Sequence, residues 1–282
     1  MRRLFLPFLF FTVAFLGVGC SRQAPPTEPT AAADTPVTAE APREVPGDAD
    51  CRLTMGWDPW PPFHYEDVGG QLAGFDVELL RAMAADAGCG LVFERDSWAA
   101  LLAKLREGRI DLLTGATITA ARQEFAVFSA PIRREEFGLY VRAGQIPAWP
   151  ADEPRALMEQ GFRLGVIGAY VYDPAIEAIL SEPAYTEQLV YAHFGEALGG
   201  LLLDGEIDGF VEEVYAAASI LRRLGLADAI TRHPMRLGEG TDVHIMYSRA
   251  SVAPEQVERL GEALSKLKSS GAYEALRVQY LE

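Results

Sequence analysis

The chain has 282 residues, of which 40 are acidic and 25 basic, so its formal net charge is −15. This acidic balance argues against a nucleic-acid partner, because such partners are recognised by clustered positive charge. Hydrophobic residues make up 49% of the chain, as in soluble globular proteins, and the part after residue 50 is long enough for two modest lobes with cores of their own.

The first residues have the features of a secretory signal. Arg2 and Arg3 precede the apolar run "LFLPFLFFTVAFLGVG", which is too short to span a membrane comfortably, and Cys20 follows it. The small residues before this cysteine resemble the lipobox of bacterial lipoproteins, with Gly17 where leucine is usual. The resemblance implies a signal peptide over 1–19, a lipid on Cys20, and an exported protein, periplasmic or otherwise extracytoplasmic, that touches the membrane through its lipid anchor only. In the alternative, cleavage falls elsewhere and Cys20 is lost or free.

The segment after Cys20, up to residue 50, is rich in proline, alanine, threonine and acidic residues. Such a composition cannot bury enough apolar surface to fold. We expect residues 20–50 to be a disordered, partly extended tether, able to hold a domain roughly 30 Å or more from the membrane.

Two further cysteines begin predicted strands. Cys51 starts one strand and Cys89 starts the next, with a helix between them. If the two are neighbouring parallel strands of one βαβ unit, their starting ends lie side by side, as a disulfide requires. We predict a Cys51–Cys89 disulfide, and two reduced, buried thiols are the alternative.

From Cys51 onward, short apolar runs alternate with amphipathic helical runs, which is typical of an α/β fold with parallel-type sheets flanked by helices. The first series has strands at 52–57, 91–95, 110–114 and 125–129, and helices from Asp76, at 97–108 and from Thr119. The second has helices at 153–161, 172–180, 194–205 and 213–225, and strands at 162–168, 187–193 and 207–211. Extended stretches at 137–144 and 242–249 and two terminal helices, at 253–270 and 272–282, complete the pattern.

Two crossing strands that join two α/β lobes would form a hinge over a cleft. We place the first lobe at 51–141 plus 243–282 and the second at 142–242. Within the first lobe, Asp76 is predicted to be the N-cap of the first long helix, and Gly88 the glycine that ends it.

Five motifs resemble, in order and spacing, the extracellular solute-binding proteins of family 3, the amino-acid-binding components of ABC importers. They are "GWDPWPPFHYED", "GFDVELLRAMAADA", "GRIDLLTGATITAAR", "FSAPI" and "GAYEALRVQYL". The resemblance covers residues 51–282 and implies the type II fold of periplasmic binding proteins, in which two lobes close on a ligand. It also implies a small-molecule ligand (an amino acid or a related carboxylate), a transporter permease as partner, no cofactor and a monomer.

Arg122 is the leading candidate for binding a ligand carboxylate. Thr119 is a good N-cap, so Arg122 falls in the first turn of a helix, where a cation opposes the helix dipole and an anion would be favourable. Its guanidinium, with the hydroxyl of Thr117 and the free N–H groups of the helix start, could hold a carboxylate. By resemblance, Arg122 and Thr117 match the carboxylate-binding positions and Gly115 a backbone contact. A solvated surface arginine is the alternative.

On the second lobe, Glu212 and Glu213 end a predicted strand. The family commonly has an aspartate at the position of Glu213, which binds the ligand's amino group, so the resemblance implies that role for Glu213 with a longer arm. A helix start that simply favours acidic residues is the alternative.

Aromatic residues and one more acid complete the predicted site. By resemblance, Asp58, Trp60 and Phe63 reach the cleft from the loop after the first strand, with Trp60 the preferred aromatic. Trp98 matches a second cleft aromatic or belongs to the core. Tyr170 and Val171 replace the usual small hydroxyl residues at another ligand-binding position, which leaves the ligand's identity open.

A metal site is not predicted, because His64, His193, His233 and His244 lack the spacing of metal ligands. Proteins of the same fold include dehydratases that use a cleft glutamate as general acid. An enzyme with Glu213 in that role is therefore the alternative to a binding protein. A sensor or a cell-wall lyase module, which we expect to carry further domains, is a third reading.

Overall fold

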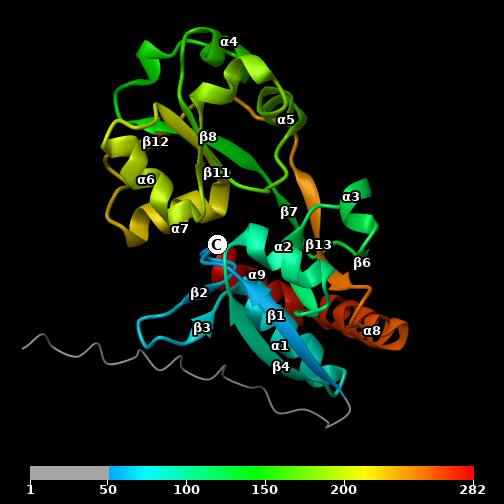
Figure 1. Ribbon diagram of the computed structural model, residues 1–282. Helices are drawn as coiled ribbons and strands as arrows, with labels where there is room; N and C mark the ends of the chain where they lie inside the picture. Colours follow the sequence, from blue (N-terminus) through cyan, green and yellow to red (C-terminus); the bar gives the residue numbers. More distant parts are fainter. Residues whose placement is uncertain (1–50) are drawn as a thin grey trace, which may run out of the picture. The chain divides into compact units, whose positions relative to one another are not determined.

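The structure is a computed structural model and describes residues 51–282. These residues form two sheets flanked by helices, together with a small hairpin (Figure 1). The α/β fold class expected from the alternating pattern is confirmed. The predicted signal peptide (1–19), the lipidated Cys20 and the tether (20–50) lie outside the described residues.

The first sheet has six strands. They are β1 (Arg52–Trp57), β4 (Gly90–Arg95), β5 (Leu112–Ala116), β6 (Ala126–Phe128), β7 (Arg133–Glu135) and β13 (Thr241–Ser248). Their order is β4-β1-β5-β13-β6, and β7 also pairs with β13. Strand β1 is parallel to β4 and β5, whereas β13 is antiparallel to β5, β6 and β7. Because β13 comes late in the chain, the first sheet combines two distant segments.

Five helices accompany the first sheet, and we call this assembly the first lobe. They are α1 (Phe75–Asp86), α2 (Trp98–Arg106), α3 (Ala120–Gln123), α8 (Pro254–Ser270) and α9 (Ala272–Leu281). Helices α1, α8 and α9 pack on one another. The apolar side chains of α1 and α8 share one buried cluster with those of β1, so the sequence's amphipathic periodicity is satisfied by this packing.

The prediction that Asp76 caps α1 is wrong. The N-cap is Gly74, at a φ of 130°, and a Cβ there would come 2.2 Å from the carbonyl oxygen of Phe63, so only glycine fits. Asp76 is the second residue of the helix, within its first turn, and its carboxylate forms an ion pair instead. Gly88 follows the helix at a φ of 70°, as predicted.

The second sheet has five strands: β8 (Phe137–Arg142), β9 (Leu164–Ile167), β10 (Leu189–Ala192), β11 (Gly209–Glu213) and β12 (Ile230–Arg232). Their order is β10-β9-β11-β8-β12. Strand β9 is parallel to β10 and β11, and β8 is antiparallel to β11 and β12.

Four α-helices and two short 3-10 helices accompany this sheet, and together they make the second lobe. They are α4 (Pro154–Glu159), α5 (Pro174–Leu180), α6 (Gly195–Leu203), α7 (Val214–Arg223), η1 (Ile146–Ala148) and η2 (Pro183–Gln188). The hairpin consists of β2 (Tyr65–Glu66) and β3 (Leu72–Ala73) and follows the loop after β1.

The chain passes between the sheets at two places that differ slightly from the predicted boundaries. All of strand β8 except Arg142 falls inside the predicted first lobe, yet the strand pairs with β11 and β12 in the second sheet, because its nearly continuous apolar sequence suits a strand buried on both faces. The first crossing is therefore at Glu136, between β7 and β8. The return is at the start of β13, where Thr241 pairs with Glu135. We propose these crossings as the lobe boundaries.

The Cys51–Cys89 disulfide is present, with Cα atoms 4.7 Å apart. Its cause is the register of the parallel pair, because Arg52 of β1 lies opposite Gly90 of β4 and brings the two strand starts together. Both cysteines are buried, at 2% and 1% exposure, and belong to the core of the first lobe.

Candidate functional site

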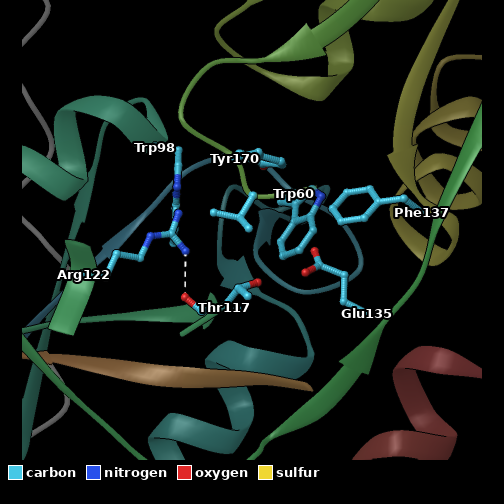
Figure 2. Close-up of a pocket in the computed structure, with 9 residues that line it drawn as sticks. Trp60, Trp98, Thr117, Arg122, Glu135, Phe137 and Tyr170 are labelled. Carbon is cyan, nitrogen blue, oxygen red and sulfur yellow. Dashed lines mark hydrogen bonds between the residues drawn. The ribbon is translucent and has the colours of Figure 1, made fainter. Parts of the chain in front are cut away.

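A pocket lies where the two lobes meet, beyond the ends of β5 and β9 (Figure 2). Its cavity volume is only about 20 Å³, roughly the room for one water molecule, because the lining side chains nearly fill it. In parallel α/β sheets, ligands bind at this carboxyl edge of the strands. The lining residues are Trp60, Trp98, Gly115, Thr117, Arg122, Glu135, Phe137, Tyr170 and Val171. The structure thus brings together six of the predicted ligand-binding residues, namely Trp60, Trp98, Gly115, Thr117, Arg122 and Tyr170.

Arg122 forms one wall of the pocket. As predicted, Thr119 caps the helix, with its hydroxyl oxygen accepting from the backbone N–H of Arg122 at 3.2 Å. Helix α3 has only four residues, so its dipole contributes little to binding an anion. The group at this helix start that could attract an anion is therefore the Arg122 guanidinium and not the helix itself. The guanidinium lies 5.5 Å from the ring centre of Trp98.

The Arg122 guanidinium is bound by carbonyl oxygens and not by an acid. Its Nη1 donates to the carbonyl of Thr117 at 3.0 Å and its Nη2 to the carbonyl of Ala169 at 3.1 Å (Figure 2 shows the first bond). The residue is only 7% exposed, and this burial lowers its pKa to about 10. No carboxylate in residues 51–282 forms an ion pair with it, and Glu135 and Glu177 act on it only at longer range. A buried, uncompensated cation of this kind favours an incoming anion.

Aromatic rings form most of the remaining wall. Trp60 comes from the loop after β1, Trp98 from the start of α2, and Tyr170 from the loop after β9. The ring of Tyr170 meets Trp60 and Trp98 edge-on, with centroid distances of 5.9 and 6.1 Å. The Trp98 indole lines the pocket and also packs with the core residues of α2. Trp98 is therefore both a pocket aromatic and a core residue, the two alternatives that the sequence left open. Phe137, which sequence reasoning missed, also lines the pocket.

Asp58 and Phe63 do not line this pocket. Asp58 is buried behind Tyr170, and its Oδ2 accepts from the Tyr170 hydroxyl at 3.4 Å. Burial raises the pKa of Asp58, although the nearby His64 opposes this. Phe63 is fully buried beneath Arg133, whose guanidinium carbon lies 3.5 Å from the centre of the Phe63 ring. Both residues therefore support the site from behind.

Arg133 is a buried cation that sequence reasoning missed. Its Nε and Nη2 face the two carboxylate oxygens of Asp76, at 3.2 and 3.4 Å. Burial alone would lower the pKa of Arg133, but Asp76 and the neighbouring glutamates outweigh it and raise that pKa. Its Nη1 is buried with no hydrogen-bond partner among the described residues. Within residues 51–282, Arg133 therefore has a counterion and Arg122 has none.

Three glutamates gather beside Arg133. Glu135 lines the pocket, and burial raises its pKa to about 8, with Glu213 and Glu212 adding to the rise and Arg133 opposing it. Glu212 and Glu213 end β11, and burial raises the pKa of each to about 7. Strand alternation was the available sequence signal for Glu135, because Arg133 and Glu135 are two residues apart on β7 and both face inward.

Glu213 does not line the pocket. Its Oε2 accepts from the backbone N–H of Ala216 at 2.8 Å and caps α7, which is the structural role that the sequence left open. Glu212 accepts from the Trp60 indole at 3.1 Å, so it links the second lobe to the first. One oxygen of each carboxylate, Glu212 Oε2 and Glu213 Oε1, is buried and lacks a partner in the described part of the chain.

Residues 51–282 contain no group of three or more histidine, cysteine or acidic side chains placed to hold a metal ion. In the same residues, every helix is too short or too polar to cross a membrane.

Comparison with known proteins gives one family over nearly the whole described chain. The sequence model of the bacterial extracellular solute-binding proteins, family 3, matches residues 53–282. A probable histidine-binding protein from Neisseria gonorrhoeae is 23% identical over 226 residues, 78% of each chain. A cyclohexadienyl dehydratase from Pseudomonas aeruginosa is 34% identical over 141 residues, which are 49% of this chain and 46% of that protein.

Solved structures agree with the fold. A histidine kinase sensor domain with similarity to periplasmic binding proteins has a TM-score of 0.71 at 24% identity, over 82% of this chain and 96% of that one. An ancestral arginine-binding protein bound to arginine has a TM-score of 0.67 at 20% identity, over 82% and 98%. These likenesses confirm the predicted two-lobed fold of periplasmic binding proteins.

Proposed function

This chain belongs to the bacterial extracellular solute-binding proteins of family 3, as its motifs predicted. On that premise we propose that it binds a small polar solute, an amino acid or a related carboxylate, and delivers it to the permease of an ABC transporter. The binding site in this proposal is the pocket lined by Arg122, Glu135 and the rings of Trp60, Trp98 and Tyr170. It needs no cofactor, and the protein acts as a monomer.

The observation that carries the proposal is the buried guanidinium of Arg122, which has no acidic partner in residues 51–282. Among the described residues, the carbonyls of Thr117 and Ala169 are its hydrogen-bond acceptors, and they use two of its five N–H groups. A carboxylate could accept two parallel N–H groups from the planar guanidinium, a geometry that also fixes the ligand's orientation. Arg133 does not compete for this role because Asp76 already neutralises it.

We propose that Glu135 binds the amino group of the ligand and that Glu213 does not contact the ligand. Glu135 lies on the pocket wall, whereas Glu213 is taken up by the helix cap of α7. An ammonium group beside Glu135 would favour the ionised carboxylate and lower the raised pKa of that group. The names of several relatives, which include histidine-binding and arginine-binding proteins, support an amino acid as the ligand.

A thermal-shift screen against the common amino acids and small carboxylates tests the proposal. A ligand at a hundred times its dissociation constant should stabilise the folded protein by about 2.7 kcal/mol, which is a clear shift in melting temperature. The same screen on Arg122→Ala is the control, since this variant should lose the shift. If carboxylates shift both proteins equally, the solute is held elsewhere.

Export and anchoring extend the proposal. The family is described as extracellular, and we propose that a signal peptide over 1–19 directs export and that Cys20 carries a lipid. Fatty-acid labelling of the wild type and of Cys20→Ala tests this. Loss of label in the variant is expected, and equal labelling would refute the assignment.

A second candidate is a dehydratase, favoured by Glu135 and by the cyclohexadienyl dehydratase relative. With a pKa of about 8, Glu135 is largely protonated at neutral pH, so it could donate a proton to a ring hydroxyl group. That group would leave as water while the ring carboxylate leaves as CO2, and the electron pair of the broken C–C bond would enter the ring. This assigns the acid to Glu135, since Glu213 does not face the pocket. The test is water loss from carboxylated cyclohexadienols, followed by absorbance. Turnover that Glu135→Gln abolishes would favour the enzyme.

A further inference from the structure

The loop after β9 reaches the pocket from the second lobe, where Tyr170 and Val171 line it and Ala169 lies directly before them. Ala169 has a φ of 64°, and it is the only non-glycine residue in 51–282 with a positive φ. This backbone conformation is uncommon for alanine. Ala169 lies two residues after Ile167, the last residue of β9, and its positive φ turns its carbonyl toward the first lobe.

The Ala169 carbonyl accepts from two N–H groups that a ligand carboxylate could use. It accepts from Nη2 of Arg122 at 3.1 Å and from the indole Nε1 of Trp98 at 3.2 Å. Both donors belong to the first lobe, while the acceptor belongs to the second. The protein's own backbone oxygen therefore occupies the anion position that the proposed function gives to the solute.

The Tyr170 side chain occupies the part of the pocket that the rest of the solute would fill. Its ring meets Trp60 and Trp98 edge-on, and Figure 2 shows all three among the residues that line the cavity. Its hydroxyl donates to the buried carboxylate of Asp58 at 3.4 Å. The Ala169 carbonyl lies on Arg122, and the Tyr170 ring lies beside Trp60 and Trp98. Together they resemble a bound solute that has a carboxylate and a planar side chain, with the Tyr170 hydroxyl as its polar end.

We propose that Ala169 and Tyr170 are an internal occupant of the solute site, which a solute must displace before its carboxylate reaches Arg122. The inference depends on the proposed function. Because only the displaced form is competent to bind, the apparent affinity is the intrinsic affinity reduced by the fraction of that form. Tyr170 then sets both the affinity threshold and the size of the solute that can enter.

The opposite role for Tyr170 is a ring that stacks on the solute. The two roles differ in sign, because removing an occupant strengthens solute binding and removing a stacking partner weakens it. Tyr170→Ala is the decisive variant, and Tyr170→Phe, which removes only the hydroxyl bond to Asp58, should give a smaller effect in the same direction. Tyr191→Ala, at a 57% exposed tyrosine of β10, is the matched control.

Two measurements on the full chain separate this inference from the proposed function. The first, without solute, is the solvent exchange of the tryptophan indole N–H groups by NMR, with Trp98 identified by Trp98→Phe. Its indole bond to Ala169 should protect it in the wild type, and exchange should become faster in Tyr170→Ala. The second is calorimetric binding of L-arginine, L-histidine and L-phenylalanine, which should be at least about fivefold tighter in Tyr170→Ala.

Faster indole exchange together with tighter binding, both absent in Tyr191→Ala, supports the internal occupant. Unchanged exchange, or weaker binding by Tyr170→Ala, overturns it. If exchange becomes faster but neither protein binds any amino acid, the solute-binding function fails and the competition fails with it. Unaltered thermal unfolding of the variants excludes misfolding as the cause.

Discussion

Arg133 and Asp76 form a buried ion pair, with Nε of Arg133 3.2 Å from Oδ1 of Asp76 and both side chains almost fully enclosed. The pair joins β7 to the first turn of α1, across 57 positions of sequence. The same guanidinium covers the rings of Phe63 and Trp60. The Asp76 carboxylate is therefore used to hold the wall of the pocket in place.

Breaking this pair should destabilise the protein strongly. Asp76→Asn leaves Arg133 buried without its counterion, and such a change costs about 3 to 5 kcal/mol. Glu78→Gln is the matched control, because Glu78 lies in the same helix and its ion pair with Arg81 is partly exposed, so the cost should be less than about 1 kcal/mol. Urea unfolding of the three proteins measures both. Equal stability of Asp76→Asn and the wild type would contradict the role given to the pair.

Arg122→Ala should weaken binding of a carboxylate ligand by more than tenfold and leave the fold intact. Truncating one partner of a buried charge-assisted pair costs roughly 2 to 5 kcal/mol. Arg122→Lys should restore little, since an ammonium cannot reproduce the planar guanidinium. Calorimetry with the ligand found by the screen gives the affinities, and Arg236→Ala, at a side chain that is 77% exposed, is the control. Affinities within about twofold for all four proteins would place the site elsewhere.

The disulfide should contribute substantially to stability. It closes a loop with a sequence separation of 38, which in the chain-entropy model corresponds to about 4 kcal/mol. The double variant Cys51→Ser and Cys89→Ser should therefore unfold at a lower urea concentration. Mass spectrometry of an unreduced digest of the wild type should show the two peptides linked. Two freely alkylated cysteines in exported protein would disprove the bond.

Stability should fall as the pH rises from about 4.5 to 8. Burial raises the pKa of Glu135 from 4.5 to about 8, so the folded protein holds this proton more tightly than the unfolded chain does. As the pH rises, the unfolded chain releases this proton at a lower pH than the folded protein does. The free energy of unfolding therefore falls until the pH reaches the pKa of the group in the folded protein. Glu212 and Glu213, with pKa values of about 7, act in the same direction.

Glu135→Gln should reduce this dependence and be more stable than the wild type at pH 8, by an amount of the order of a few kcal/mol. Melting temperatures between pH 5 and pH 8 measure it. Glu239→Gln, at a side chain that is 85% exposed, should follow the wild type. A wild-type melting temperature that rises over this range would contradict the buried, protonated state of Glu135.

The sequence by itself determined the local structure and the family. Every α-helix and strand longer than four residues overlaps a segment that periodicity predicted, because amphipathic repeats and turn glycines act within a few neighbouring residues, whereas the 3-10 helix η2 was missed. Thr119 caps its helix and Gly88 ends its own for the same local reason. The disulfide followed from a βαβ unit, whose geometry is fixed once its strands are parallel neighbours.

Only the tertiary structure decided how distant charges pair. Asp76 has the right residue type for a cap, but Arg133 lies 57 positions away and claims its carboxylate. Glu213 looks like a ligand-binding acid, yet it caps α7, while Glu135 reaches the pocket from β7. The bond from Arg122 to Ala169 joins two lobes. Such pairings depend on which segments the packed cores bring together, and short-range patterns carry no information about that choice.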